Sequence, residues 1–117
     1  MQDRFKFRFW FKDTQEMIYS EKFNDVQTLG QWLFEDRKDV VKMQCTGLKD
    51  KKCKLIYEGD VVKFKTELFG KPKQIIWNEC HYILKDTFII LCDMEIKQFG
   101  LEIIGNIYEN KELLNGE

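Results

Sequence analysis

Residues 43–64 read MQCTGLKDKKCKLIYEGDVVKF, and this stretch is the most informative part of the chain. A lysine-rich loop separates two glycine-containing segments, at residues 46–47 and 58–60. Glycine favours turns because it adopts unusual φ angles, and aspartate favours them because it accepts hydrogen bonds from nearby backbone N–H groups. We therefore interpret six positions as structural turn residues: Thr46, Gly47, Glu58, Gly59, Asp60 and, further along the chain, Gly105.

Alternating side chains on both sides of this stretch predict β-strands. Residues 5–11 place four phenylalanines on one face and Lys6, Arg8 and Trp10 on the other, which is the period-2 pattern of a half-buried strand. Residues 17–23 can return beside it as a hairpin, and residues 61–69 alternate in the same way. Further strands are expected at residues 40–45, which Thr46-Gly47 would end before a polar loop at 48–54, and at 74–78, 81–85, 87–92 and 101–107.

Helical signals are few. Val26, Leu29, Trp32 and Leu33 form one apolar stripe, so a short helix is expected near residues 25–37. Residues 112–114 predict a C-terminal helical turn, and residues 95–99 fit either a helix or a strand. The fold class expected is mainly β, a β-rich α+β protein, with a small antiparallel SH3-like barrel or sandwich.

Length and composition favour one intracellular domain over residues 1–117. Of these residues, 44% are apolar and 33% are charged, so the chain can build a core. It has neither a long apolar run for a membrane nor an apolar leader, so we expect no membrane partner and a cytoplasmic location. Cys45, Cys53, Cys80 and Cys92 lack the close pairing of a zinc site, so we expect reduced thiols, no metal and no cofactor.

The net charge of −1 hides a strong asymmetry. Residues 42–73 carry nine lysines against four acidic residues, whereas residues 74–117 carry three lysines against eight. The basic segment could bind a partner or nucleic acid, or it could attract the acidic segment within one chain or between copies. The candidate partner or nucleic-acid surface consists of Lys49, Lys51, Lys52, Lys54, Lys63, Lys65, Trp10 and Trp77.

Catalytic interpretations are weaker. Glu58 and Asp60, with Glu109, could act as acid and base if they shared a cleft. Cys80 and His81 are neighbours on a predicted strand, so their side chains point to opposite faces and do not form a nucleophile pair. We expect no catalytic residues.

The central stretch resembles the YopX family of bacteriophage and prophage proteins. The resemblance rests on residues 43–50 and 56–62, on residues 8–10 and 17–19 near the start, and on residues 102–110 with 113–114 near the end. The family usually has an aromatic residue in place of Cys45 and an Asn-Gly-like turn in place of Lys52-Cys53. The resemblance implies a phage-encoded, mainly β protein, and it implies no activity, because the family has no established function or catalytic residues.

These observations favour a non-catalytic module that binds a protein, including another copy of itself. Paired alternating strands, many aromatic residues and segments of opposite charge motivate this interpretation. The alternative is a nucleic-acid-binding module that uses residues 42–73. No small-molecule ligand is expected.

Overall fold

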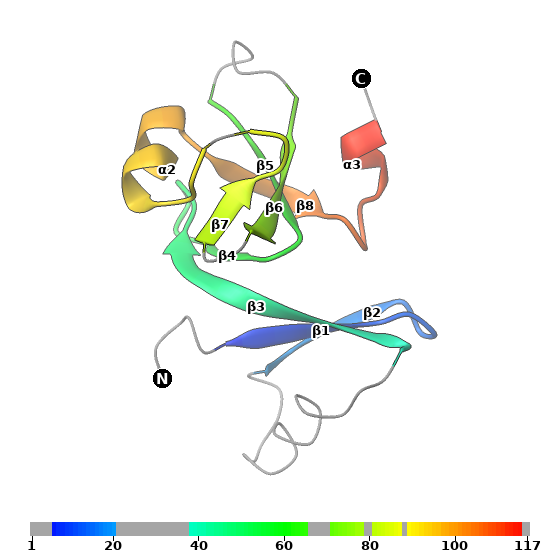
Figure 1. Cartoon of the computed structure of the whole chain (residues 1–117). Coiled ribbons are helices and arrows are strands. Elements are labelled where there is room, and N and C mark those ends of the chain that lie inside the picture. Colours follow the sequence, from blue (N-terminus) through cyan, green and yellow to red (C-terminus); the bar gives the residue numbers. More distant parts are fainter. Residues whose placement is uncertain (1–5, 21–37, 66–70, 79–80, 88, 116–117) are drawn as a thin grey trace.

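Two antiparallel sheets meet at a short junction and form a curled half-barrel (Figure 1). The computed structural model describes residues 6–20, 38–65, 71–78, 81–87 and 89–115. The strand orders are β2-β1-β3-β4 in the first sheet and β7-β6-β5-β8 in the second. Every pairing within the two sheets is antiparallel. The prediction of a mainly β antiparallel fold is therefore confirmed.

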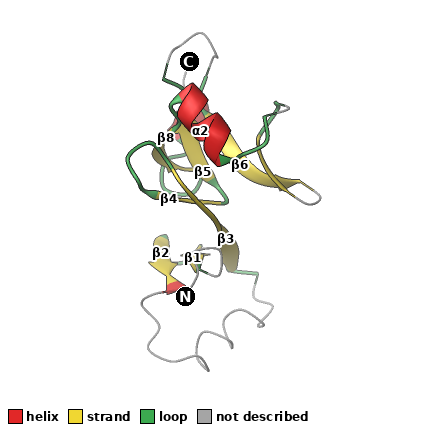
Figure 2. Ribbon diagram, turned by 90° about the vertical axis from the view of Figure 1, so that its left-hand side faces the viewer, coloured by secondary structure: helices red, strands yellow, loops and turns green. Residues whose placement is uncertain are grey.

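The first sheet is built around a hairpin and one long strand. The predicted hairpin is confirmed, with Phe9 opposite Ile18. The long strand pairs with the first strand of the hairpin near its start and with a short strand at its end, so it extends from the hairpin toward the other sheet (Figures 1 and 2). The elements are β1 (Phe7–Phe11), β2 (Glu16–Tyr19), β3 (Val40–Lys49) and β4 (Leu55–Tyr57).

The second sheet carries both described helices. A hairpin of two strands projects sideways from the body of this sheet, as Figure 2 shows. The elements are β5 (Asp60–Lys63), β6 (Lys73–Asn78), β7 (His81–Leu84), α2 (Asp93–Phe99), β8 (Glu102–Asn106) and α3 (Glu112–Asn115). The C-terminal helical turn is thus confirmed, and the ambiguous residues 95–99 lie in a helix.

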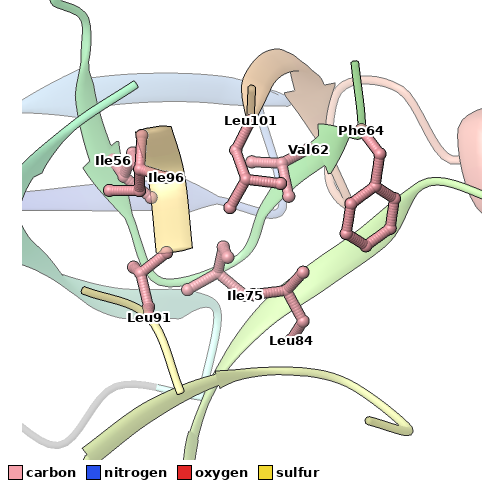
Figure 3. Packing of buried hydrophobic residues seen from close by; sticks show 8 residues of the cluster. All are labelled: Ile56, Val62, Phe64, Ile75, Leu84, Leu91, Ile96 and Leu101. Atoms are coloured by element: carbon pink, nitrogen blue, oxygen red, sulfur yellow. The ribbon is translucent and has the colours of Figure 1, made fainter. Parts of the chain in front are cut away.

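The hydrophobic core fills the space between β4, the second sheet and α2 (Figure 3). Its cluster of buried side chains consists of Ile56, Val62, Phe64, Ile75, Leu84, Leu91, Ile96 and Leu101. Val61 is fully buried as well, although it points away from Val62 along β5. The face of β5 opposite Val62 is therefore covered at residue 61, whereas Lys63, two residues later, is exposed.

Three predicted boundaries differ from the structure. Thr46 and Gly47 do not end a strand, because β3 continues through them with a shift of register between Cys45 and Lys49. Residues 87–92 do not form a strand, since their described part makes only an isolated bridge between Ile83 and Ile90. The expected helix near residues 25–37 lies outside the described residues. No helix among the described residues is long and apolar enough to cross a membrane.

Gly105 lies within β8 and not at a turn. A Cβ atom at this position would lie 2.5 Å from Asn110 Oδ1 and 2.6 Å from Leu113 Cδ1. The register of β5 against β8 also shifts here, because Val61 pairs with Gly105 and Val62 with Ile103. The glycine therefore lets the chain that follows β8 pack directly on the strand.

We expect Gly105→Ala to lower the free energy of unfolding by about 1–3 kcal/mol, because the new methyl group overlaps two neighbours. Urea denaturation of the purified protein measures this loss. Asn110→Ala removes one of the two neighbours, so the double variant should lose less than the sum of the two single variants. Strictly additive losses would contradict the proposed overlap.

Candidate functional site

The turn at residues 58–60 carries the chain from the first sheet to the second. Gly59 has a φ of 92°, which favours glycine, and a Cβ atom there would lie 3.1 Å from Met43 Sδ. Asp60 Oδ2 accepts a hydrogen bond of 2.7 Å from the Tyr57 N–H. This is the local chemistry expected from the sequence, but the turn joins strands of different sheets instead of making a hairpin.

A buried ion pair crosses the junction. Arg8 Nη2 of β1 lies 2.9 Å from Asp60 Oδ1 of β5, and both side chains are nearly inaccessible, at 2% and 4% exposure. The same Nη2 donates to the Glu58 carbonyl oxygen at 3.1 Å, and the guanidinium lies 4.9 Å from the centre of the Tyr57 ring. Arg8 therefore connects β1 to the turn at residues 58–60 and to β5 of the second sheet.

Burial sets the pKa of both acidic residues in the turn. Loss of solvent raises the pKa of Asp60, although Arg8 and the Tyr57 N–H act in the opposite direction. Burial likewise raises the pKa of the half-buried Glu58 carboxyl. Burial also raises the pKa of two tyrosines nearby, and the charge of Glu58 raises it further. The pKa of Tyr82 reaches about 12, and the pKa of Tyr108 rises above its usual value.

The same face of β1 is also covered further along the strand. Trp10 is 5% exposed and stacks on Tyr108, with ring centres 5.7 Å apart. Asn106 positions this tyrosine, because its Oδ1 accepts the backbone N–H groups of Tyr108 and Glu109. The assignment of Trp10 to a partner surface is therefore wrong: β1 is an inner strand, and the segment after β8 packs over its tryptophan.

A cavity of about 730 Å³ lies between the two sheets. Residues of β1 to β4 line one side, and residues of β5, β8 and the segment after β8 line the other. Its basic residues are Lys6, Arg8, Lys49 and Lys54, and its acidic residues are Asp60 and Glu109. A volume of this order is usual for small-molecule sites. Sequence patterns do not indicate this cavity, because its lining comes from strands far apart in the chain.

The loop between β3 and β4 is held by one buried carboxylate. Asp50 Oδ1 accepts the backbone N–H groups of Lys52 and Lys54, each at 2.9 Å. Asp50 Oδ2 accepts the Ile103 N–H of β8, also at 2.9 Å. Asp50, which sequence reasoning missed, thus shapes the lysine loop and attaches it to the second sheet. Its sequence signal is an Asx turn, with aspartate two residues before the bonded N–H.

The predicted lysine surface separates into three groups. Lys51, Lys52 and Lys63 surround Glu102 of β8, at 3.5, 2.8 and 3.7 Å from its carboxylate oxygens. Lys49 and Lys54 line the cavity instead, and Lys65 is exposed beside Gly100. The basic and acidic segments therefore attract each other within one chain at Glu102, one of the alternatives left open by the sequence.

The remaining candidates lie apart from one another. Trp77 of β6 is 50% exposed and contacts Tyr82 edge to face. Asp60 and Glu109 share the cavity, whereas Glu58 does not line it. Cys80 lies outside the described residues, and within the described ranges no three histidine, cysteine or acidic side chains gather as a metal site would require.

Comparison with known proteins agrees with this architecture. The family model described as YopX protein matches residues 6–115. The crystal structure of protein EF1440 from Enterococcus faecalis superposes with a TM-score of 0.69 and 23% sequence identity. That match covers 93% of this chain and 96% of the other, so the two share a fold. No curated protein matches the chain.

We expect Asp60→Asn to destabilise the protein by about 3–5 kcal/mol, because it leaves the Arg8 charge buried without a counter-charge. Chemical denaturation measures the loss, and Glu16→Gln on an exposed strand end serves as the control. Arg8→Met combined with Asp60→Asn should cost less than the two single changes together. A loss below about 0.5 kcal/mol for Asp60→Asn, the range of ordinary surface changes, would contradict the role of the pair.

Cys53 is exposed and has a φ of 64° in the loop that Asp50 holds, where the family usually has an Asn-Gly-like turn. A side chain in this conformation is strained, so Cys53→Gly should raise the free energy of unfolding by about 0.5–1 kcal/mol. Lys54→Gly, one position later without a positive φ, should lower it. Equal effects of the two glycines in thermal unfolding would count against the strain.

The hydrogen bond from Lys52, with the charges of the surrounding lysines, lowers the pKa of Glu102 below its ordinary value of 4.5. Because the folded-state pKa lies below the unfolded one, this stabilisation is present above the unfolded pKa and is lost as pH falls through the folded pKa. An NMR titration of the Glu102 carboxyl carbon should show Lys52→Met raising the pKa. Lys65→Met, a matched change on an exposed lysine, should leave it unmoved.

Proposed function

The chain belongs to the YopX family, and we propose that it is a non-catalytic module that binds a protein partner through the hairpin of β6 and β7. We place this activity in the cytoplasm of a bacterium that carries the encoding phage. The single observation that carries the proposal is Trp77, whose ring remains half exposed near the end of a projecting hairpin.

The surroundings of Trp77 support a docking role. Its ring centre lies 4.8 Å from that of Tyr82, which packs against the hydrophobic core. The core therefore holds the tryptophan in place through Tyr82. Tryptophan and tyrosine dominate the binding energy of many protein interfaces because they bury a large rigid surface at low entropic cost. Ile90, 48% exposed, adds apolar surface beside β7, where it forms a bridge with Ile83.

The junction supports a non-catalytic role. Both carboxylate oxygens of Asp60 are engaged, one by Arg8 and one by the Tyr57 N–H. Glu109 Oε1 accepts a 2.7 Å hydrogen bond from the Asn106 side chain. A general acid or base needs a proton-transfer path to its substrate, and these bonds give both carboxylates a structural use.

We expect Trp77→Ala to weaken binding of the partner without unfolding the chain. The immobilised protein is incubated with lysate of phage-infected host cells, and the bound protein is identified and its affinity measured after purification. Met94→Ala removes a side chain that is 71% exposed in α2 and should leave the affinity unchanged. Loss of the anchor should weaken binding at least tenfold, which corresponds to about 1.4 kcal/mol.

Sedimentation velocity at micromolar concentration distinguishes a second copy from a different protein. A wild-type dimer that Trp77→Ala converts to monomer would identify the partner as another copy of the chain. A monomer that retains no protein, or retains equal amounts with and without Trp77, would overturn the proposal.

A further inference from the structure

One residue that lines the cavity between the sheets has an unused hydrogen-bond donor. Arg8 lines the cavity and is 2% exposed, and its Nε has no acceptor within the described part of the chain. Its Nη2 is already engaged by Asp60 and the Glu58 carbonyl. A buried, charged donor without a partner costs free energy, so its presence on a residue that lines a cavity points to a ligand that supplies the acceptor.

The charges around Arg8 define the chemistry of that ligand. Lys49 and Lys54 line the same cavity, and neither forms an ion pair with a carboxylate among the described residues. Asp60 does not repel an anion strongly here, since Arg8 compensates its charge at 2.9 Å. A guanidinium donor with two ammonium groups suits a phosphate, which accepts several charge-assisted hydrogen bonds.

The part of the cavity formed after β8 has different groups. Glu109 and Asn110 contribute a carboxylate and an amide. One oxygen of each accepts a hydrogen bond from Asn106, and their remaining lone pairs can accept hydrogen bonds from hydroxyl or amino groups of a ligand. A volume of about 730 Å³ also exceeds what a phosphate ion alone would fill. The lining therefore suits a molecule with a phosphate at one end and hydrogen-bond donors at the other.

We propose that this cavity binds a small phosphomonoester, whose phosphate accepts the Arg8 Nε–H and is neutralised by Lys49 and Lys54. The rest of the ligand, which carries hydroxyl or amino groups, lies toward Glu109 and Asn110. This site is separate from Trp77, so it stands or falls independently of the protein-binding function.

Calorimetry with adenosine 5′-monophosphate tests the proposal, because this probe carries a phosphate, two hydroxyl groups and an amino group. We expect binding that weakens with salt, and weaker binding by at least about tenfold for adenosine, which lacks the phosphate. Inorganic phosphate alone should bind more weakly than the nucleotide. Equal affinity for adenosine and its phosphate, or no binding at millimolar concentration, would overturn the proposal.

Two double variants with the same change of charge locate the site. Lys49→Ala with Lys54→Ala should reduce the affinity at least about tenfold, because each ammonium contributes a charge-assisted contact. Lys65→Ala with Lys85→Ala removes two exposed lysines that do not line the cavity and should leave the affinity unchanged. Equal losses in both variants would indicate general surface attraction and overturn the proposal.

The Arg8 Nε–H signal in a ¹H–¹⁵N spectrum gives a direct readout. Titration with the nucleotide should shift this signal, since the donor gains its acceptor. Arg8→Lys keeps the charge without the Nε donor, so it should weaken binding, provided that circular dichroism shows the native fold. An unmoved Nε–H signal in wild-type protein with saturating nucleotide would contradict the assignment whether or not the variant folds.

Short single-stranded oligonucleotides with and without a 5′-phosphate distinguish the source of the phosphate. Preference for the phosphorylated end would place a terminal phosphomonoester in the cavity and support the proposal. Binding that ignores the terminal phosphate and responds equally to both lysine pairs would instead indicate a surface for the nucleic-acid backbone, and would overturn the proposal.

Discussion

A buried ion pair between Arg8 and Asp60 organises the junction of the two sheets. It is nearly inaccessible to solvent and joins the first strand of one sheet to the first strand of the other. Breaking such a pair is costly because the remaining charge stays buried. The pair therefore fixes the distance between the sheets, and with it the cavity that opens beside them and the packing of Tyr108 on Trp10.

Local patterns predicted much of the fold. The alternation of residues 5–11 predicted β1, and the Glu58-Gly59-Asp60 segment predicted a turn with aspartate bonded to the backbone, as found. Such patterns depend on neighbours in sequence, so one chain is enough to recognise them. The same alternation placed Arg8 and Trp10 together on one face but could not indicate what covers it, because Asp60 and Tyr108 are distant in sequence.

The candidate site was predicted less well for the same reason. A count of lysines in residues 42–73 suggested one basic surface. In the structure, three of these lysines form ion pairs with Glu102 of β8, and two others line the cavity. Thr46 and Gly47 resembled a turn, yet pairing with β4 and a shift of register keep them within β3. In both cases the local sequence pattern was real, but contacts with residues distant in sequence determined the structure.

Asp50 also bears on how the chain is made. Its carboxylate bonds the lysine loop and, 53 residues later, the Ile103 N–H of β8. Synthesis proceeds from the N-terminus, so this oxygen meets its partner only after the residues up to Ile103 have been made. β5 likewise pairs along one edge with β8, which is made about 40 residues later. Non-local pairings of this kind slow folding. The loop between β3 and β4 therefore gains its last hydrogen bond only after β8 has been made.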